Sequence, residues 1–163
     1  MPRFDPESML RVLADQDVEY ILIGGLAATL HGSPLRTGDT DICPATSPEN
    51  LERLAAALRA MDARIRSPDA PQGLPFGCDA RFLAGVELLN LATKFGDLDV
   101  CFRPAGTAGY EELQRNVVTL ALGELVIPVA ALSDIIRSKE SADRPRDRAA
   151  LPTLRALLER SRS

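Results

Sequence analysis

Residues 20–44, YILIGGLAATLHGSPLRTGDTDICP, carry the pattern that decides the fold. The stretch predicts a short apolar strand at residues 20–23, a tight turn at Gly24 and Gly25, a short helix, a loop and a second strand. The second strand opens at Asp39. A strand that turns directly into a helix and then returns as a strand indicates an α/β domain.

Two pairs of aspartates occupy alternate positions at the start of apolar strands. Asp39 and Asp41 form the first pair, and Asp97 and Asp99 repeat the spacing later in the chain. Alternate residues of a strand point to the same face, so each pair shares a face and its carboxylates repel each other. If the two strands are neighbours, three or four carboxylates converge, and two Mg²⁺ ions would neutralise such a cluster.

The turn at Gly24 and Gly25 predicts an anion site. A strand that ends in two glycines and runs straight into a helix presents free backbone N–H groups and the positive end of the helix dipole. Glycine also lets a phosphate approach the backbone closely. Because this turn opens the helix that leads to Asp39, we interpret it as a phosphate cradle beside a metal site, an arrangement suited to phosphoryl or nucleotidyl transfer.

The rest of the sequence predicts helices and strands on both sides of this stretch. Helices are expected at residues 6–17, 48–61, 109–115, 130–141 and 145–160, the last broken or kinked near Pro152. Strands are expected at residues 64–66, 91–94, 98–102, 117–122 and 125–129. Three prolines and two glycines at residues 67–77 predict a loop, and residues 82–89 fit either a helix or a strand.

We therefore expect an α/β fold in which a mixed sheet is flanked by helices, with two helices at the C-terminal end. Residues 1–129 would form the core, and residues 130–163 a helical extension packed on it as part of a single domain. A chain of 163 residues is long enough to bury a substantial core.

Composition limits the cellular setting. The formal charge of −4 argues against indiscriminate binding to nucleic acid or to anionic membranes. The longest apolar run, residues 20–30, has about half the length that a membrane span needs. The N-terminal segment carries Asp5 and Glu7 and lacks the apolar core of a signal peptide, and three cysteines without metal-ligand spacing fit a reducing compartment. We expect a cytoplasmic protein without a membrane partner.

These residues resemble a known superfamily. Gly24-Gly25, the run Arg36-x-x-Asp39-x-Asp41 and the later Asp99 look like the nucleotidyltransferase fold superfamily, which includes polymerase-β-like and aminoglycoside nucleotidyltransferases. The wider pattern, which ends in S-K-E…R-x-x-D on the predicted last two helices, is similar to the minimal bacterial branch that includes type IV toxin nucleotidyltransferases. The resemblance covers the chain from about residue 20 to about residue 158.

The resemblance implies a role for each matching residue. Asp39 and Asp41 would ligate two Mg²⁺ ions, one of them held through the triphosphate of an NTP substrate. Asp99 would complete the second metal site and help to deprotonate the acceptor hydroxyl. Gly24 and Gly25 would hold the terminal phosphates, and the reaction would transfer NMP and release pyrophosphate. Many members have Gly-Ser at this turn, so the glycine at position 25 removes a hydroxyl contact to phosphate.

Four further polar residues each have two possible assignments. Arg36 and Lys139 are candidates for nucleotide binding, and a surface charge is the alternative for both. His31, the only histidine, is assigned to a structural cap or packed ring, with a substrate contact as the alternative. Asp97 is assigned to a solvated turn, with the third metal carboxylate as the alternative.

Two principal functional hypotheses remain open from the sequence. The first is an active Mg²⁺-dependent nucleotidyltransferase whose acceptor is a tRNA end, a protein side chain or a small molecule. The second is a non-catalytic module that binds a nucleotide or a partner, such as one half of a toxin–antitoxin pair with a cognate antitoxin or another small protein. A plain α/β domain with aspartates at its turns is a third reading.

Overall fold

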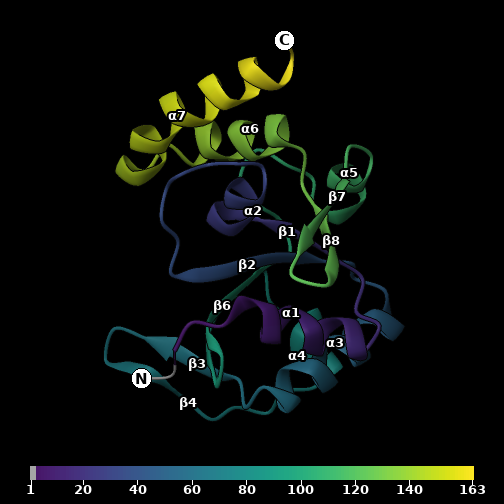
Figure 1. Cartoon of the computed structure of the whole chain (residues 1–163). Coiled ribbons are helices and arrows are strands. Elements are labelled where there is room, and N and C mark those ends of the chain that lie inside the picture. Colours follow the sequence, from purple (N-terminus) through teal and green to yellow (C-terminus); the bar gives the residue numbers. More distant parts are fainter. Residues whose placement is uncertain (1–2) are drawn as a thin grey trace.

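The architecture is that of a computed structural model, which describes residues 3–163 (Figure 1). The strands are β1 (Tyr20–Ile23), β2 (Asp39–Pro44), β3 (Arg64–Ser67), β4 (Ala70–Leu74), β5 (Leu88–Thr93), β6 (Gly96–Cys101), β7 (Val118–Leu122) and β8 (Leu125–Val129). The helices are α1 (Pro6–Asp15), α2 (Gly24–Leu30), α3 (Pro48–Ala60), α4 (Ala80–Ala84), α5 (Tyr110–Gln114), α6 (Leu132–Ala142) and α7 (Pro145–Ser161). Within the described residues, no helix combines the length and apolar character that crossing a membrane requires.

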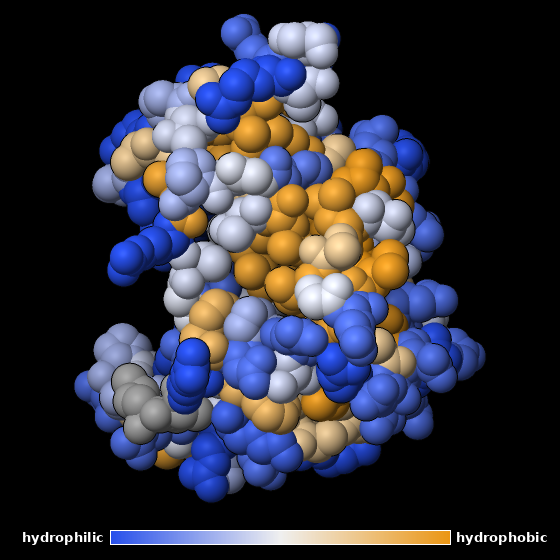
Figure 2. Space-filling model, viewed as in Figure 1, coloured by the Kyte–Doolittle hydropathy of each residue, from blue (hydrophilic) through white to orange (hydrophobic). Residues whose placement is uncertain are grey.

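The strands form one mixed sheet in the order β4-β3-β5-β6-β2-β1-β8-β7. Helices α1, α3 and α4 lie on one side of the sheet, and α2, α6 and α7 are stacked on the other (Figure 1). The surface is hollowed on one flank, between the stacked helices and the β3–β4 hairpin (Figure 2). The predicted α/β fold with a mixed sheet, flanking helices and two C-terminal helices is confirmed.

The pairing of β2 with β6 brings the two aspartate pairs together. These strands are parallel neighbours, with Asp39 opposite Asp97 and Asp41 opposite Asp99. The alternating residues Leu98 and Val100 are fully buried in the core, which leaves the aspartates on the opposite face. The neighbouring strands required for a carboxylate cluster are therefore present.

The predicted loop at residues 67–77 is wrong in part. Ala70–Leu74 form β4, which pairs antiparallel with β3 at one edge of the sheet. Proline is tolerated on an edge strand, where its missing N–H need not serve a second neighbour, so Pro71 does not prevent the pairing. The ambiguous residues 82–89 divide between the end of α4 and the start of β5.

Helix α7 runs through Pro152 without the break that the sequence suggested. The buried side chains of Leu151 and Leu154 on either side of the proline pack into the hydrophobic core. We infer that this packing anchors both halves of the helix and offsets the missing backbone hydrogen bond.

Asn50 ties the outer ends of β1 and β2 together. It lies in the first turn of α3 and is fully buried. Its side-chain oxygen accepts from the Glu19 N–H at 2.7 Å, and its side-chain nitrogen donates to the carbonyl oxygens of Glu19 at 2.8 Å and Ala45 at 2.7 Å. One amide thus satisfies three backbone groups next to the strand pair that carries the Gly24 turn and Asp41.

We expect Asn50→Leu to destabilise the protein, because the branched leucine side chain has no polar atom that could replace the amide. The change leaves the Glu19 N–H and the Ala45 carbonyl without partners, each worth about 1–3 kcal/mol, so the free energy of unfolding should fall by about 2 kcal/mol or more. The Glu19 carbonyl still accepts from the Ala45 N–H. Denaturant unfolding measures this difference. Glu52→Gln, on the exposed face of the same helix, is the matched control and should change stability by less than about 0.5 kcal/mol. Equal stability of Asn50→Leu and the wild type would contradict this role of Asn50.

Candidate functional site

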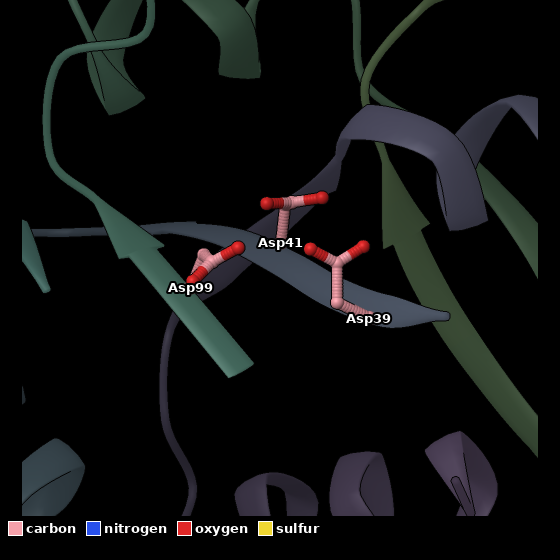
Figure 3. A group of neighbouring side chains, drawn as sticks. All are labelled: Asp39, Asp41 and Asp99. Carbon is pink, nitrogen blue, oxygen red and sulfur yellow. The ribbon is translucent and has the colours of Figure 1, made fainter. Parts of the chain in front are cut away.

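Three carboxylates meet on the sheet face that lies toward α2 and α6. Asp39 and Asp41 extend from β2 and Asp99 extends from β6, and one oxygen of each lies within 4.8 Å of the others (Figure 3). Carboxylate oxygens at this spacing are the donor set that Mg²⁺ and similar hard cations prefer. The residues present therefore fit a divalent cation.

Burial and mutual repulsion make this cluster hold protons. Burial, together with the charges of Asp39 and Asp99, raises the pKa of Asp41 to about 8, while the charge of Lys139 acts in the opposite direction. Burial also raises the pKa of Asp99 to about 6, against the opposing charge of Arg66. A bound divalent cation would displace these protons and favour the ionised carboxylates.

The Gly24–Gly25 turn closes against this cluster. Gly24 has φ +73°, a backbone conformation that favours glycine, and a Cβ there would collide with the carboxylate of Asp41. A Cβ at Gly25 would lie 3.0 Å from the Thr37 hydroxyl oxygen. The Thr37 hydroxyl therefore lies beside the position where a serine side chain at residue 25 would begin.

One cavity contains all the residues predicted for the site. Its volume is about 550 Å³, and it extends from the sheet to α6 and the start of α7. Its walls include the predicted carboxylates, turn glycines and basic residues: Asp39, Asp41, Asp99, Gly24, Gly25, Arg36 and Lys139. Arg36 is exposed, whereas the Lys139 side chain is 19% exposed. The placement agrees with the sequence prediction, and the roles of these residues stay predictions.

Asp147 pairs with two basic residues, Lys139 and Arg144, near the start of α7. It is fully buried, accepts from Arg144 Nε at 2.7 Å, and lies 3.4 Å from Lys139 Nζ. Asp147 also accepts from the Arg144 backbone N–H and so caps the start of the helix. The contact of Asp147 with Lys139 has no sequence signal, since it depends on how α6 packs against α7.

Arg66 is a residue of the site that the sequence analysis did not predict. It lies on β3 and forms ion pairs with both Asp97 and Asp99. Asp97 was assigned to a solvated turn, but it lies within β6, and its side chain is 44% exposed. Its position opposite Asp39 in the sheet and its pairing with Arg66 explain why it is not a turn residue.

His31 makes a structural contact. It follows α2 as its C-terminal cap residue, and its Nε2 lies 2.9 Å from the carbonyl oxygen of Ala130. This contact connects the end of α2 with the segment that leads into α6. The geometry fits the packed-ring assignment made from the sequence.

Comparison with solved structures identifies the fold. No family model matches the sequence, and no curated protein matches it. The lincomycin-bound structure of the lincosamide antibiotic adenylyltransferase LnuA is 16% identical, with a TM-score of 0.60 over 95% of this chain and 99% of that chain. A protein from Thermotoga maritima, described as a candidate nucleotidyltransferase, is 17% identical, with a TM-score of 0.56 over 98% of this chain and 97% of that chain. The chain has the nucleotidyltransferase fold.

The metal-free protein should lose stability as the pH rises. The pKa of Asp41 is about 8 in the folded protein, whereas an aspartate in an unfolded chain has a pKa near 4. The protonated carboxyl therefore stabilises the folded state fully below about pH 4, and this stabilisation disappears as the pH rises through about 8. We expect the Tm of the metal-free protein to fall between about pH 5 and about pH 8.5, and saturating Mg²⁺ to restore it.

Asp41→Asn tests the origin of this pH dependence. Removal of the ionisable group should raise the metal-free Tm at about pH 8.5 by several degrees, at about 2–4 °C per kcal/mol, and leave little response to Mg²⁺. Asp69→Asn, at an exposed turn, is the control and should follow the wild type. A metal-free Asp41→Asn protein with the same pH profile as the wild type would show that the cluster does not strain the fold.

Proposed function

We propose that this protein transfers a nucleoside monophosphate from an NTP to an acceptor hydroxyl, in a reaction that uses two Mg²⁺ ions and releases pyrophosphate. The observation that carries this proposal is the meeting of Asp39, Asp41 and Asp99 within 4.8 Å in one cavity with the Gly24–Gly25 turn. The nucleotidyltransferase fold supports the same class of reaction.

The proposed roles follow from where each residue lies. Asp39 and Asp41 would hold the metal ions, which supply charge neutralisation for the phosphates when bound. Asp99 would complete the second metal site and help to accept the proton of the acceptor hydroxyl. The N–H groups of the turn and the ammonium of Lys139 would contact the phosphates.

Arg36 is the weaker of the two basic candidates. It borders the cavity on the segment that leads into β2, and it is exposed. We propose that it contacts the outer part of the triphosphate, where exposed charges contribute less than the partly buried Lys139.

The helical extension belongs to the proposed catalytic unit. Residues 1–129 would form the nucleotidyltransferase core, and residues 130–163 would complete the cavity as part of a single domain. Lys139 on α6 lines the same cavity as the aspartates on β2 and β6, which supports this division. We also propose a cytoplasmic protein, the setting in which NTPs are available.

The acceptor class can be ranked for testing. LnuA is an adenylyltransferase for lincosamide antibiotics, a class of small molecules. On that likeness we place small hydroxylated molecules first among the acceptors, followed by tRNA and proteins. The cavity volume of about 550 Å³ lies within the usual range for small-molecule sites.

Transfer assays with each labelled NTP test the proposal. The protein is incubated with Mg²⁺ and with a lincosamide, bulk tRNA or a protein extract, and mass spectrometry identifies the modified product. Asp41→Asn should reduce the rate at least about 100-fold, while Lys139→Ala should raise the KM for NTP. Asp69→Asn is again the control. Absence of product with every acceptor, together with absence of Mg²⁺-dependent NTP binding, would overturn the proposed function.

A partner-binding role is the second candidate. Apolar side chains gather on the surface over the β7–β8 region (Figure 2), where Val118 is 37% exposed and Val126 is 73% exposed. Strand β7 forms one edge of the sheet, and exposed apolar patches on edge strands are common contact surfaces. A cognate antitoxin or another small protein would fit this role. A stable complex that binds NTP but shows no turnover would favour it over catalysis.

A further inference from the structure

Arg66 is anchored at three points on two other strands. Its side chain extends from β3 across β5 to β6, following the order of strands in the sheet. Its Nη2 lies 3.0 Å from Asp99 Oδ1, and its Nη1 lies 3.4 Å from Asp97 Oδ1. Its Nη1 also donates to the carbonyl oxygen of Leu91 at 2.7 Å. The planar guanidinium is therefore fixed in orientation as well as in position.

The backbone of β3 is irregular at Arg66. The register of β3 against β4 shifts between Ile65 and Ser67, the residues on either side of Arg66. A bulge in a strand changes the direction of a side chain, and such bulges recur beside functional sites. The backbone irregularity therefore lies at the residue whose side chain makes the three contacts.

The contact with Asp99 restricts the rotation of its carboxylate. Arg66 holds one oxygen, Oδ1, through a charge-assisted hydrogen bond. One Asp99 oxygen points toward Asp39 and Asp41, and the other points away from them (Figure 3). A group that fixes one oxygen of a carboxylate also fixes the direction of the other.

We propose that Arg66 is a positioning residue, which holds Asp99 so that one of its oxygens faces Asp39 and Asp41. This inference rests on the proposed function, because it concerns the same carboxylate site. Arg66 approaches from the β3 side of β6, whereas the Gly24–Gly25 turn follows β1 on the far side of β2. Arg66 therefore acts on the carboxylate and not on the triphosphate.

The affinity of the protein for Mn²⁺ tests the positioning role of Arg66, and its measurement does not require the acceptor substrate to be known. Electron paramagnetic resonance of free Mn²⁺ gives the affinity of the purified protein for the metal alone. Arg66→Lys keeps the positive charge but cannot reproduce the three contacts of the guanidinium. We expect it to weaken Mn²⁺ binding about tenfold, the size of effect that residues orienting a metal ligand usually show.

The charge of Arg66 alone predicts a different pattern. If Arg66 acted only as a nearby cation, Arg66→Lys would bind Mn²⁺ like the wild type, and Arg66→Met would bind it more tightly because repulsion is removed. If Arg66 positions Asp99, neither variant binds Mn²⁺ more tightly than the wild type. Arg64→Lys is the matched control, since Arg64 is exposed on the same strand, and it should stay within about twofold of the wild type.

A double-mutant cycle with Asp99→Asn separates positioning from a general loss of structure. If Arg66 acts through Asp99, Arg66→Lys should change the Mn²⁺ affinity of the Asp99→Asn protein by less than about twofold. Full additivity of the two substitutions would overturn the inference, as would unchanged affinity in Arg66→Lys alone. Absence of Mn²⁺ binding by the wild type would instead overturn the metal site of the proposed function, and with it the role of Arg66.

The cycle remains informative if Arg66→Lys lowers the Tm. Asp97→Asn leaves Arg66 in place and removes one of its anchors, the half-exposed one. We expect Asp97→Asn to weaken Mn²⁺ binding about threefold when it is made in the wild-type protein. The same substitution should not change Mn²⁺ binding when it is made in the Asp99→Asn protein. An equal effect in both backgrounds would overturn the inference.

Discussion

Electrostatic repulsion among three aspartates is the constraint around which the rest of the structure is arranged. Asp39, Asp41 and Asp99 share a partly buried space, where charges interact more strongly than they do in water. Two cations from different elements lie near the cluster, Lys139 on α6 and Arg66 on β3. Each cation is shared with a further carboxylate, Asp147 or Asp97, so neither neutralises the cluster completely. Such an arrangement favours a divalent cation in the remaining space.

The fold provides the rigidity that this repulsion requires. The cluster lies on β2 and β6, the two central strands of the sheet, and the opposite face of β6 is buried under apolar side chains such as Leu98. At the far end of the β1–β2 pair, Asn50 fixes the backbone through three hydrogen bonds. Sites built on strands with packed neighbours hold their geometry better than sites on loops.

The sequence predicted those parts of the site that have a local signal. Asp39, Asp41 and Asp99 alternate with apolar residues within single strands, and Gly24 and Gly25 lie at a strand–helix turn, so short patterns were sufficient. The contacts of Arg66 and Asp147 depend on strand order and on helix packing, which no short pattern encodes. Strand β4 was missed for a related reason, because its proline and glycine indicate a loop unless its place at the sheet edge is known. Site residues with a local sequence pattern could therefore be predicted, whereas contacts between residues far apart in the sequence could not.

The parallel pairing of β2 with β6 also determines when the site can exist during synthesis. Asp39 and Asp41 leave the ribosome well before the segment that carries Asp99, and Lys139 follows later still. At the usual elongation rate of roughly 5–20 residues per second, the nascent chain spends several seconds with two of the three carboxylates and no partner strand for β2 on the β6 side. The carboxylate cluster can therefore form only after β6 has been made, and Lys139 is the last of the predicted site residues to join the cavity.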